Sequence, residues 1–229
     1  MTKTLQPRYR AVLFDLDGTI ADTLADLTAS LNVVLSQYGQ PARTKEEVCS
    51  FIGNGILLLV ERAFPSGTDG AVMKAAQKDF LTYYGAHFAE ETKPYPDVLA
   101  LLKELSTAGV KLALVSNKSH EMVCGIANRF FSGIFSYALG CSEKTPRKPD
   151  PTGVFLAMQA LGVSKEEACY VGDSEVDVQT AQNAGMDCVS VTWGYRTKEQ
   201  LLDAGAKRLA HSACELQKEL FYNKENDHA

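Results

Sequence analysis

Short apolar runs alternate with segments of helical periodicity along most of the chain. The apolar runs have the length of buried strands. They cover residues 11–14, 111–116, 135–139, 168–172 and 188–192. Between them, apolar residues recur every three or four positions, as they do in amphipathic helices. These helical segments cover residues 97–108, 121–131, 152–161 and 176–184. Strands that alternate with helices predict an α/β fold, a doubly wound and mostly parallel sheet with helices on both faces.

One segment breaks this alternation, because it contains helical patterns and no strand pattern. Its helical patterns cover residues 24–38, 56–64 and 72–88, with a further helix that begins after residue 44. Thr44 followed by Glu47 has the spacing of a capping box and predicts where that further helix starts. We expect the four helices to form a small α-helical cap domain, residues 22–91, inserted into a core domain of residues 1–21 and 92–229.

The composition narrows the class of protein. A net charge of −5 over 229 residues disfavours nonspecific nucleic-acid binding, which needs a basic face. No stretch approaches the roughly 20 apolar residues that span a bilayer, so we expect no membrane partner. The first residues contain no apolar signal sequence, and the six cysteines include no Cys-x-x-Cys pair that would indicate a zinc site. We expect a cytoplasmic protein that is a monomer or a small homo-oligomer.

Two carboxylates stand where the first apolar run ends. Asp15 and Asp17 are two residues apart, and Gly18 lets the backbone turn after them. Such pairs are ordinarily solvated, but burying charge without a partner is strongly unfavourable. In open α/β sheets, ligands bind beyond the carboxyl ends of the strands, where Ser116 ends one apolar run and Asp173 follows another. The pattern predicts a divalent metal ion and a reacting group at this edge of the sheet.

Four segments resemble the sequence signatures of the haloacid dehalogenase superfamily, and they occur in the family's order. The segments are Asp15-Leu16-Asp17-Gly18-Thr19, Ser116-Asn117, Lys148-Pro149-Asp150-Pro151 and Gly172-Asp173-Ser174-Glu175-Val176-Asp177. The resemblance implies a Rossmann-like core with a helical cap, and hydrolysis of phosphate monoesters with the help of Mg²⁺. True dehalogenases of the superfamily lack the acid that Asp17 provides here, which favours phosphoryl chemistry over carbon–halogen cleavage.

The resemblance also assigns roles to the carboxylates. Asp15 would attack phosphorus and form an aspartyl-phosphate. Asp17 would protonate the leaving oxygen and then activate the water that hydrolyses the intermediate. Mg²⁺ would be held by Asp15, by the backbone carbonyl of Asp17 and by Asp173. Asp177, one helical turn beyond Asp173, would orient a bound water or ligand without contacting the metal ion itself. A carboxylate at this position also suits the N-terminus of a helix.

Ser116, Asn117 and Lys148 match the positions with which the family binds phosphate. Taken alone, Ser116 is an ordinary helix cap, and Lys148 is an ordinary solvated lysine in a loop. Together with the other signatures, Lys148 is expected to hold phosphate and to offset the negative charge of the nucleophile. The family pattern does not require Arg147 or Lys118, and we expect both to be surface charges.

The cap is expected to decide the substrate, and its sequence resembles that of phosphoglycolate phosphatases. The resemblance lies in Ile52-Gly53-Asn54-Gly55-Ile56, in Glu61-Arg62-Ala63 and in Trp193-Gly194-Tyr195-Arg196 after the last strand. Gly53 and Asn54 would approach the substrate in a loop, and Arg62 would meet a carboxylate. A plain turn and a surface arginine are the alternatives. The small phosphorylated metabolite is therefore expected to be 2-phosphoglycolate.

Other activities fit the same signatures. The chain could hydrolyse a sugar phosphate, a nucleotide or pyrophosphate, or it could be a phosphosugar mutase that returns the phosphoryl group to its substrate. It could also be a non-catalytic binding protein on the same scaffold. The intact set of acidic, hydroxyl and lysine residues disfavours that last class.

Overall fold

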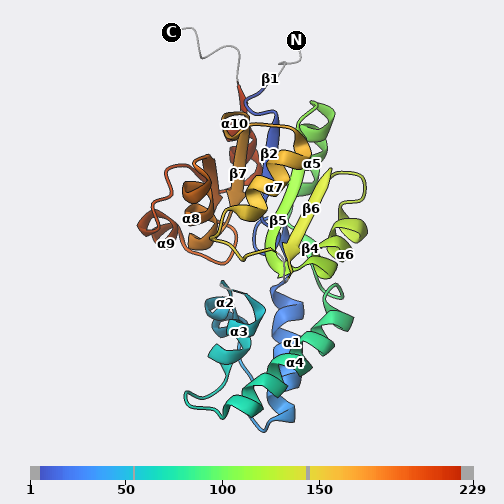
Figure 1. Ribbon diagram of the computed structural model, residues 1–229, viewed down its shortest axis with the longest axis vertical. Helices are drawn as coiled ribbons and strands as arrows, with labels where there is room; N and C mark the ends of the chain where they lie inside the picture. The colour runs from blue at the N-terminus through green and yellow to red at the C-terminus, as the bar shows by residue number, and fades with distance from the viewer. Residues whose placement is uncertain (1–5, 54, 143–144, 223–229) are drawn as a thin grey trace. The chain divides into compact units, whose positions relative to one another are not determined.

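Six parallel strands form the central sheet in the order β6-β5-β2-β7-β8-β9. Figure 1 labels β6, β5, β2 and β7 among them. The computed structural model describes residues 6–53, 55–142 and 145–222. The strands are β2 (Ala11–Phe14), β5 (Lys111–Ser119), β6 (Tyr137–Cys141), β7 (Ala168–Gly172), β8 (Asp187–Val191) and β9 (Leu209–Ala210). The first of them, β2, lies between β5 and β7. This order confirms the predicted doubly wound parallel sheet.

Helices cover both faces of this sheet. They are α5 (Val98–Thr107), α6 (His120–Phe130), α7 (Thr152–Leu161), α8 (Glu175–Ala184), α9 (Lys198–Asp203) and α10 (Ala213–Leu220), with a 3₁₀ turn η1 (Lys165–Glu167). The chain crosses from β2 to β5 in one direction and from β6 back to β7 in the other. Since such crossovers are right-handed, α5 and α7 lie on opposite faces, and α8 packs beside α7.

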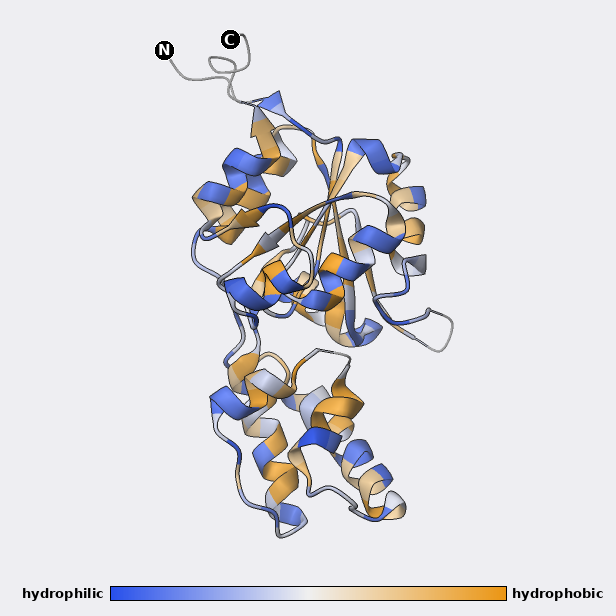
Figure 2. Ribbon diagram, turned by 90° about the vertical axis from the view of Figure 1, so that its left-hand side faces the viewer, coloured by the Kyte–Doolittle hydropathy of each residue, from blue (hydrophilic) through white to orange (hydrophobic). Residues whose placement is uncertain are grey.

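The core of this α/β unit lies where α7 and α8 meet the middle of the sheet. All four residues of β2 are buried, as its uninterrupted apolar run predicts for a strand covered on both faces. Leu13 packs with Ala157 of α7 and Ala181 of α8 in one apolar cluster. Figure 2 shows hydrophobic residues concentrated along the strands. Burying one large aliphatic side chain stabilises the fold by about 1.5–3 kcal/mol, so this cluster fixes the strand that carries the first motif.

The structure differs from the predicted elements at several ends. The strand β5 continues three residues beyond Ser116, and β6 begins two residues later than the apolar run. The short elements β9, α9 and α10 were not predicted, although Thr197 and Gln200 form a capping box at the start of α9. Near the ends of the described chain, β1 (Gln6–Pro7) pairs with β10 (Phe221–Tyr222).

Contacts divide the chain into two compact units, residues 1–20 with 94–229, and residues 21–93. The second unit contains α1 (Leu24–Gln37), α2 (Lys45–Phe51), α3 (Ile56–Ala63) and α4 (Gly70–His87). The capping box predicted from Thr44 and Glu47 is present at the start of α2. Two short strands, β3 (Ala21–Asp22) and β4 (Lys93–Pro94), pair where the chain enters and leaves this unit. We did not predict β3 from the sequence, because a strand of two residues is too short to produce an alternating pattern of apolar and polar residues.

Inside the helical unit, α1 packs along α4. The buried carboxylate of Asp26 on α1 accepts hydrogen bonds from the backbone N–H groups of Glu91 and Thr92, at 2.9 Å each, and from Thr92 Oγ1 at 2.7 Å. These bonds tie the end of the unit to its first helix. Within the described residues, none of the helices combines the length and the apolar character that crossing a bilayer requires.

Candidate active site

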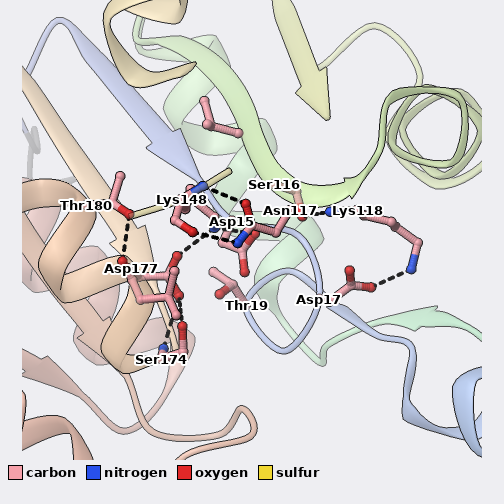
Figure 3. A network of polar contacts seen from close by, with 12 residues as sticks. Asp15, Asp17, Thr19, Ser116, Asn117, Lys118, Lys148, Ser174, Asp177 and Thr180 are labelled. Atoms are coloured by element: carbon pink, nitrogen blue, oxygen red, sulfur yellow. Dashed lines mark hydrogen bonds and ion pairs between the residues drawn. The ribbon is translucent and has the colours of Figure 1, made fainter. Parts of the chain in front are cut away.

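Asp15 follows the last residue of β2, at the carboxyl end of the central strand. Its backbone N–H donates to Val171 O of the neighbouring strand at 2.9 Å, so the parallel pairing continues to this residue. The residue is only 8% exposed. Parallel strands end at one edge of the sheet, and Figure 3 shows Ser116 and Lys148 beside Asp15 at this edge. An oxygen of Asp173 lies within 4.8 Å of one of Asp15. All four side chains are buried.

The ammonium of Lys148 lies between two carboxylates. Its Nζ is 2.8 Å from Asp15 Oδ1 and 2.7 Å from Asp177 Oδ1, and it donates to the hydroxyl of Tyr170 at 3.0 Å. Burial by itself would lower the pKa of Lys148, but the negative charges of Asp15 and Asp177 raise it well above its usual value. Lys148 is therefore a fixed positive charge directly beside Asp15, as predicted from its position in the third signature.

Asn117 holds the backbone of Lys148 with its side-chain amide. The Oδ1 atom accepts from Lys148 N at 2.7 Å, and Nδ2 donates to Lys148 O at 3.0 Å. We expected Asn117 to bind phosphate, but its amide is turned toward the Lys148 main chain. The geometry assigns this side chain to placing the lysine, because a two-point clamp fixes both the position and the direction of the peptide that carries it.

Three buried carboxylates lie close enough to share one cation. Asp15, Asp173 and Asp177 each offer an oxygen, and these oxygens lie within 4.8 Å of one another. Burial raises the pKa of Asp15 to about 6, against the opposing charge of Lys148. Burial, followed by the charges of Asp177 and Asp15, raises the pKa of Asp173 well above its usual range. A set of hard carboxylate oxygens with excess negative charge suits a divalent cation such as Mg²⁺.

Asp177 accepts more of the described hydrogen bonds from the protein than either of the other two carboxylates does. Its Oδ2 accepts from Ser174 Oγ at 2.6 Å, and from the backbone N–H groups of Asp173 and Ser174 at 3.2 and 3.1 Å. Its Oδ1 accepts from Lys148. Asp177 closes the capping box of α8 and is fully buried. Because these donors occupy its oxygens, Asp177 is better suited to supporting the metal ligands than to contacting a cation itself. Asp15 and Asp173 are better suited to direct contact with a cation.

The backbone packs tightly around Asp173. Its Oδ1 accepts from Thr19 Oγ1 at 3.0 Å, and its Oδ2 accepts from Tyr195 N at 2.7 Å. A Cβ atom on either Gly18 or Gly194 would collide with this carboxylate, and Gly18 also has a φ of 84°, which favours glycine. The segment after β8, singled out by its sequence, therefore helps to place a site carboxylate.

Lys118 is not the surface charge that we expected. Its side chain is 1% exposed, and its Nζ lies 2.8 Å from Asp17 Oδ1. The prediction was wrong because β5 continues beyond Ser116 and carries Lys118 into the sheet. Pairing with Asp17 offsets the charge of the buried ammonium. Arg147 is exposed, as expected.

The remaining predicted residues belong to the helical unit. Gly53 has a φ of 142°, a conformation that favours glycine. Asn54 lies outside the described residues. The guanidinium of Arg62 is exposed and donates to Phe51 O at 2.8 Å, which links α3 to the end of α2. The predicted catalytic, phosphate-binding and metal-binding residues described above all belong to the α/β unit.

Comparisons with known proteins identify sequences that are similar over most of this chain. Residues 12–191 match the model of the haloacid dehalogenase-like hydrolases. The phosphoglycolate phosphatase of Caulobacter vibrioides is 34% identical over 213 residues, which cover 90% of this chain and 89% of that protein. The phosphoglycolate phosphatase of Pseudomonas savastanoi pv. phaseolicola is 36% identical over 192 residues, 81% of this chain and 70% of that protein.

Solved structures are similar over nearly the whole chain. A protein from Lactobacillus delbrueckii subsp. bulgaricus, described as a candidate phosphoglycolate phosphatase, is 35% identical with a TM-score of 0.89. The match covers 93% of this chain and 98% of that one. The CbbY protein from Rhodobacter sphaeroides, solved in complex with phosphate, is 26% identical with a TM-score of 0.71, and the match covers 91% and 96% of the two chains.

Proposed function

Because the chain belongs to the haloacid dehalogenase-like hydrolases, we propose that it is a Mg²⁺-dependent phosphomonoester hydrolase whose substrate is 2-phosphoglycolate. The observation that carries this proposal is the position of Asp15. The buried carboxylate of Asp15 lies at the end of the central strand, 2.8 Å from the buried ammonium of Lys148. The carboxylate of Asp173, which follows β7, lies close to it. That arrangement suits a nucleophile that attacks an anionic phosphoryl group, since the charge of Lys148 offsets the repulsion between the two.

The first half of the reaction transfers the phosphoryl group to Asp15. A carboxylate oxygen of Asp15 attacks phosphorus, and the bond between phosphorus and the ester oxygen breaks. Asp17 gives its proton to the departing oxygen, so that an alcohol leaves instead of an alkoxide. The product on the enzyme is an aspartyl-phosphate, one of the carboxylate intermediates known from covalent catalysis.

The second half returns Asp15 to its free form. Asp17, now a carboxylate, accepts a proton from a water molecule as the water oxygen attacks phosphorus. The bond between phosphorus and the Asp15 oxygen breaks, and inorganic phosphate leaves. Lys148 and the hydroxyl of Ser116 hold the phosphoryl oxygens in both halves. The residues that would hold Mg²⁺ are Asp15, Asp173 and the backbone carbonyl of Asp17, and a bound ion would supply positive charge to the phosphoryl oxygens.

The substrate assignment rests on the relatives and on the helical unit. The α/β unit presents groups for phosphate and metal, and these groups do not distinguish one phosphate ester from another. We propose that residues 22–91 act as the cap, that Gly53 and Asn54 approach the substrate, and that Arg62 binds the carboxylate of 2-phosphoglycolate. The curated relatives named phosphoglycolate phosphatase support this choice.

A panel of small phosphates tests the substrate. The purified protein with millimolar Mg²⁺ is expected to release phosphate from 2-phosphoglycolate with a kcat/KM at least tenfold above that for glucose 6-phosphate, AMP or pyrophosphate. Arg62→Met is expected to raise KM for 2-phosphoglycolate without changing KM for phosphate esters that lack a carboxylate. A preference for another member of the panel would replace the substrate and leave the chemistry in place. An isomerised sugar phosphate without free phosphate would indicate a mutase.

Mg²⁺ is expected to stabilise the folded protein. Ligands that bind only the native state add stability in proportion to the logarithm of their concentration, about 2.7 kcal/mol at 100 times Kd. For a chain of this size, that corresponds to a rise in melting temperature of roughly 5–10 °C. Thermal scans in EDTA and in saturating MgCl₂ measure it. Asp173→Asn should reduce the shift strongly, whereas Asp203→Asn, an exposed carboxylate on α9, should not. An equal shift in both variants would place the ion elsewhere.

Asn117→Ala is expected to lower kcat/KM by about ten- to a hundredfold, because the lysine that it clamps is displaced from Asp15. Asn183→Ala is a matched control. Its amide donates to Pro149 O at 2.9 Å from an exposed position in α8, so it touches the same loop without holding Lys148. Steady-state kinetics should leave Asn183→Ala within about twofold of the wild type. Comparable losses in the two variants would show that general loosening of the loop, and not the clamp, lowers activity.

A further inference from the structure

Lys118 is a buried cation that the reaction described above does not use. Its Nζ is 2.8 Å from Asp17 Oδ1, and its side chain is almost completely shielded from solvent. Figure 3 shows this pair apart from the group formed by Asp15, Lys148 and Asp177. The site therefore provides a separate buried lysine for each carboxylate of the first motif, Lys148 for Asp15 and Lys118 for Asp17.

The two members of the Lys118–Asp17 pair are held differently. Lys118 lies in β5 where the pairing with β6 shifts register between Val115 and Ser119. Its backbone N–H donates to Ser116 Oγ at 3.3 Å, and Gly140 of β6 packs so closely against its carbonyl that a Cβ atom would collide with it. These contacts hold the backbone from which its side chain starts. Asp17 lies in the turn after β2, and its side chain is 17% exposed. A carboxylate is planar, so holding Oδ1 against a fixed ammonium also restricts where Oδ2 can lie. The sheet thereby determines the position of a carboxylate that stands outside it.

We propose that Lys118 is a positioning residue for Asp17, and that it orients this carboxylate for proton transfer to the leaving oxygen. This inference rests on the proposed function, because it takes Asp17 as the acid of a phosphomonoester hydrolase. Lys118 acts through Asp17 and not on the phosphoryl group, which Lys148 holds. The charge and the length of Lys118 both contribute, since the ammonium must reach Oδ1 from the strand.

Substrates with different leaving groups distinguish a role of Lys118 in orienting Asp17 from a purely structural role. Glycolate leaves 2-phosphoglycolate as a strongly basic alkoxide unless an acid protonates it. The phenolate of p-nitrophenyl phosphate is stable without a proton. The ratio kcat/KM reports the steps through the formation of the aspartyl-phosphate, so it contains the departure of these groups. A defect in the placement of Asp17 should therefore reduce kcat/KM for 2-phosphoglycolate far more than for p-nitrophenyl phosphate.

The experiment compares Lys118→Met, Asp17→Asn and the double variant on both esters. Lys118→Met is expected to lower kcat/KM for 2-phosphoglycolate by roughly 30-fold, within the range of general acid catalysis, and for p-nitrophenyl phosphate by less than about threefold. In the Asp17→Asn background, Lys118→Met should change kcat/KM less than about twofold, because residues that act through one another are non-additive. Lys103→Met, at an exposed position of α5, is the control for removing a lysine.

Melting temperatures of all variants are measured in parallel, and the same cycle is run with Lys118→Gln if Lys118→Met does not fold. Equal losses on the two esters, or a full additional loss in the Asp17→Asn background, would overturn the positioning role while leaving the hydrolase in place. A wild-type protein that hydrolyses neither ester would overturn both proposals. Activity of Lys118→Met equal to that of the wild type on 2-phosphoglycolate would overturn the positioning role alone.

Discussion

Asp15→Asn is expected to reduce turnover of 2-phosphoglycolate by about 10⁴-fold or more, because an amide lacks the nucleophilic carboxylate oxygen. The fold should survive. The substitution keeps the shape of the side chain and removes one of the negative charges that crowd Asp173. Burial already raises the pKa of Asp15 to about 6, so the ionised form is not favoured by its surroundings in the metal-free protein. Steady-state kinetics and a thermal scan measure both effects.

The control for this prediction is Asp203→Asn, which makes the same chemical change at an exposed position. Its activity and melting temperature should match those of the wild type. Mass spectrometry of Asp15→Asn is needed to exclude deamidation, which would restore aspartate. Activity above about 1% of the wild type in a protein shown to contain asparagine would falsify the covalent mechanism.

Lys148→Met is expected to have the second large effect, on stability as well as on activity. Methionine keeps an unbranched side chain of similar length but leaves Asp15 and Asp177 buried without their shared ammonium, which lies within 2.8 Å of both. Breaking a buried ion pair in this way costs about 3–5 kcal/mol. Activity should also fall by about 10²–10³-fold, as it does when one donor to a developing charge is lost.

Urea unfolding in EDTA measures the loss of stability. Lys103→Met, with an exposed side chain, is the matched control and should change the free energy of unfolding by less than about 0.5 kcal/mol. The loss caused by Lys148→Met should shrink in an Asp15→Asn background, because one fewer carboxylate remains unpaired there. An unchanged loss in that background would mean that packing, and not charge, makes Lys148 important for stability.

The features that we predicted correctly from the sequence are those that depend on the pattern of neighbouring residues in the chain. The run of residues 11–14 identified β2, and therefore placed Asp15 at the carboxyl end of a buried strand. The alternation of strands and helices identified the parallel sheet, because such a sheet requires its strands to be covered on both faces. Thr44 and Glu47 identified the start of α2, since a capping box is made within four residues.

The contacts that were not predicted join residues that are far apart in the chain. Lys118 was expected at the surface because the family pattern does not require it, and its partner Asp17 is 101 positions away. The amide of Asn117, a residue expected to bind phosphate from the family's pattern, contacts the backbone of Lys148, 31 positions later, and phosphate binding by Asn117 stays a prediction. Neither contact is visible in the local sequence, since the direction of a side chain at the end of a strand depends on the neighbouring loops.

The sequence by itself determined the class of fold, the strands that end at the site, and the carboxylates and Lys148 that stand there. Each of these follows from short-range periodicity, turn chemistry and motif spacing. Only the tertiary structure decided which ammonium pairs with which carboxylate, and that oxygens of Asp15, Asp173 and Asp177 lie within 4.8 Å of one another. The packing of strands β2, β5 and β7 against one another sets which charged side chains meet in the site. Hydrogen bonds and ion pairs form only over a few ångströms, and the separation of two residues along the chain does not tell whether they come that close.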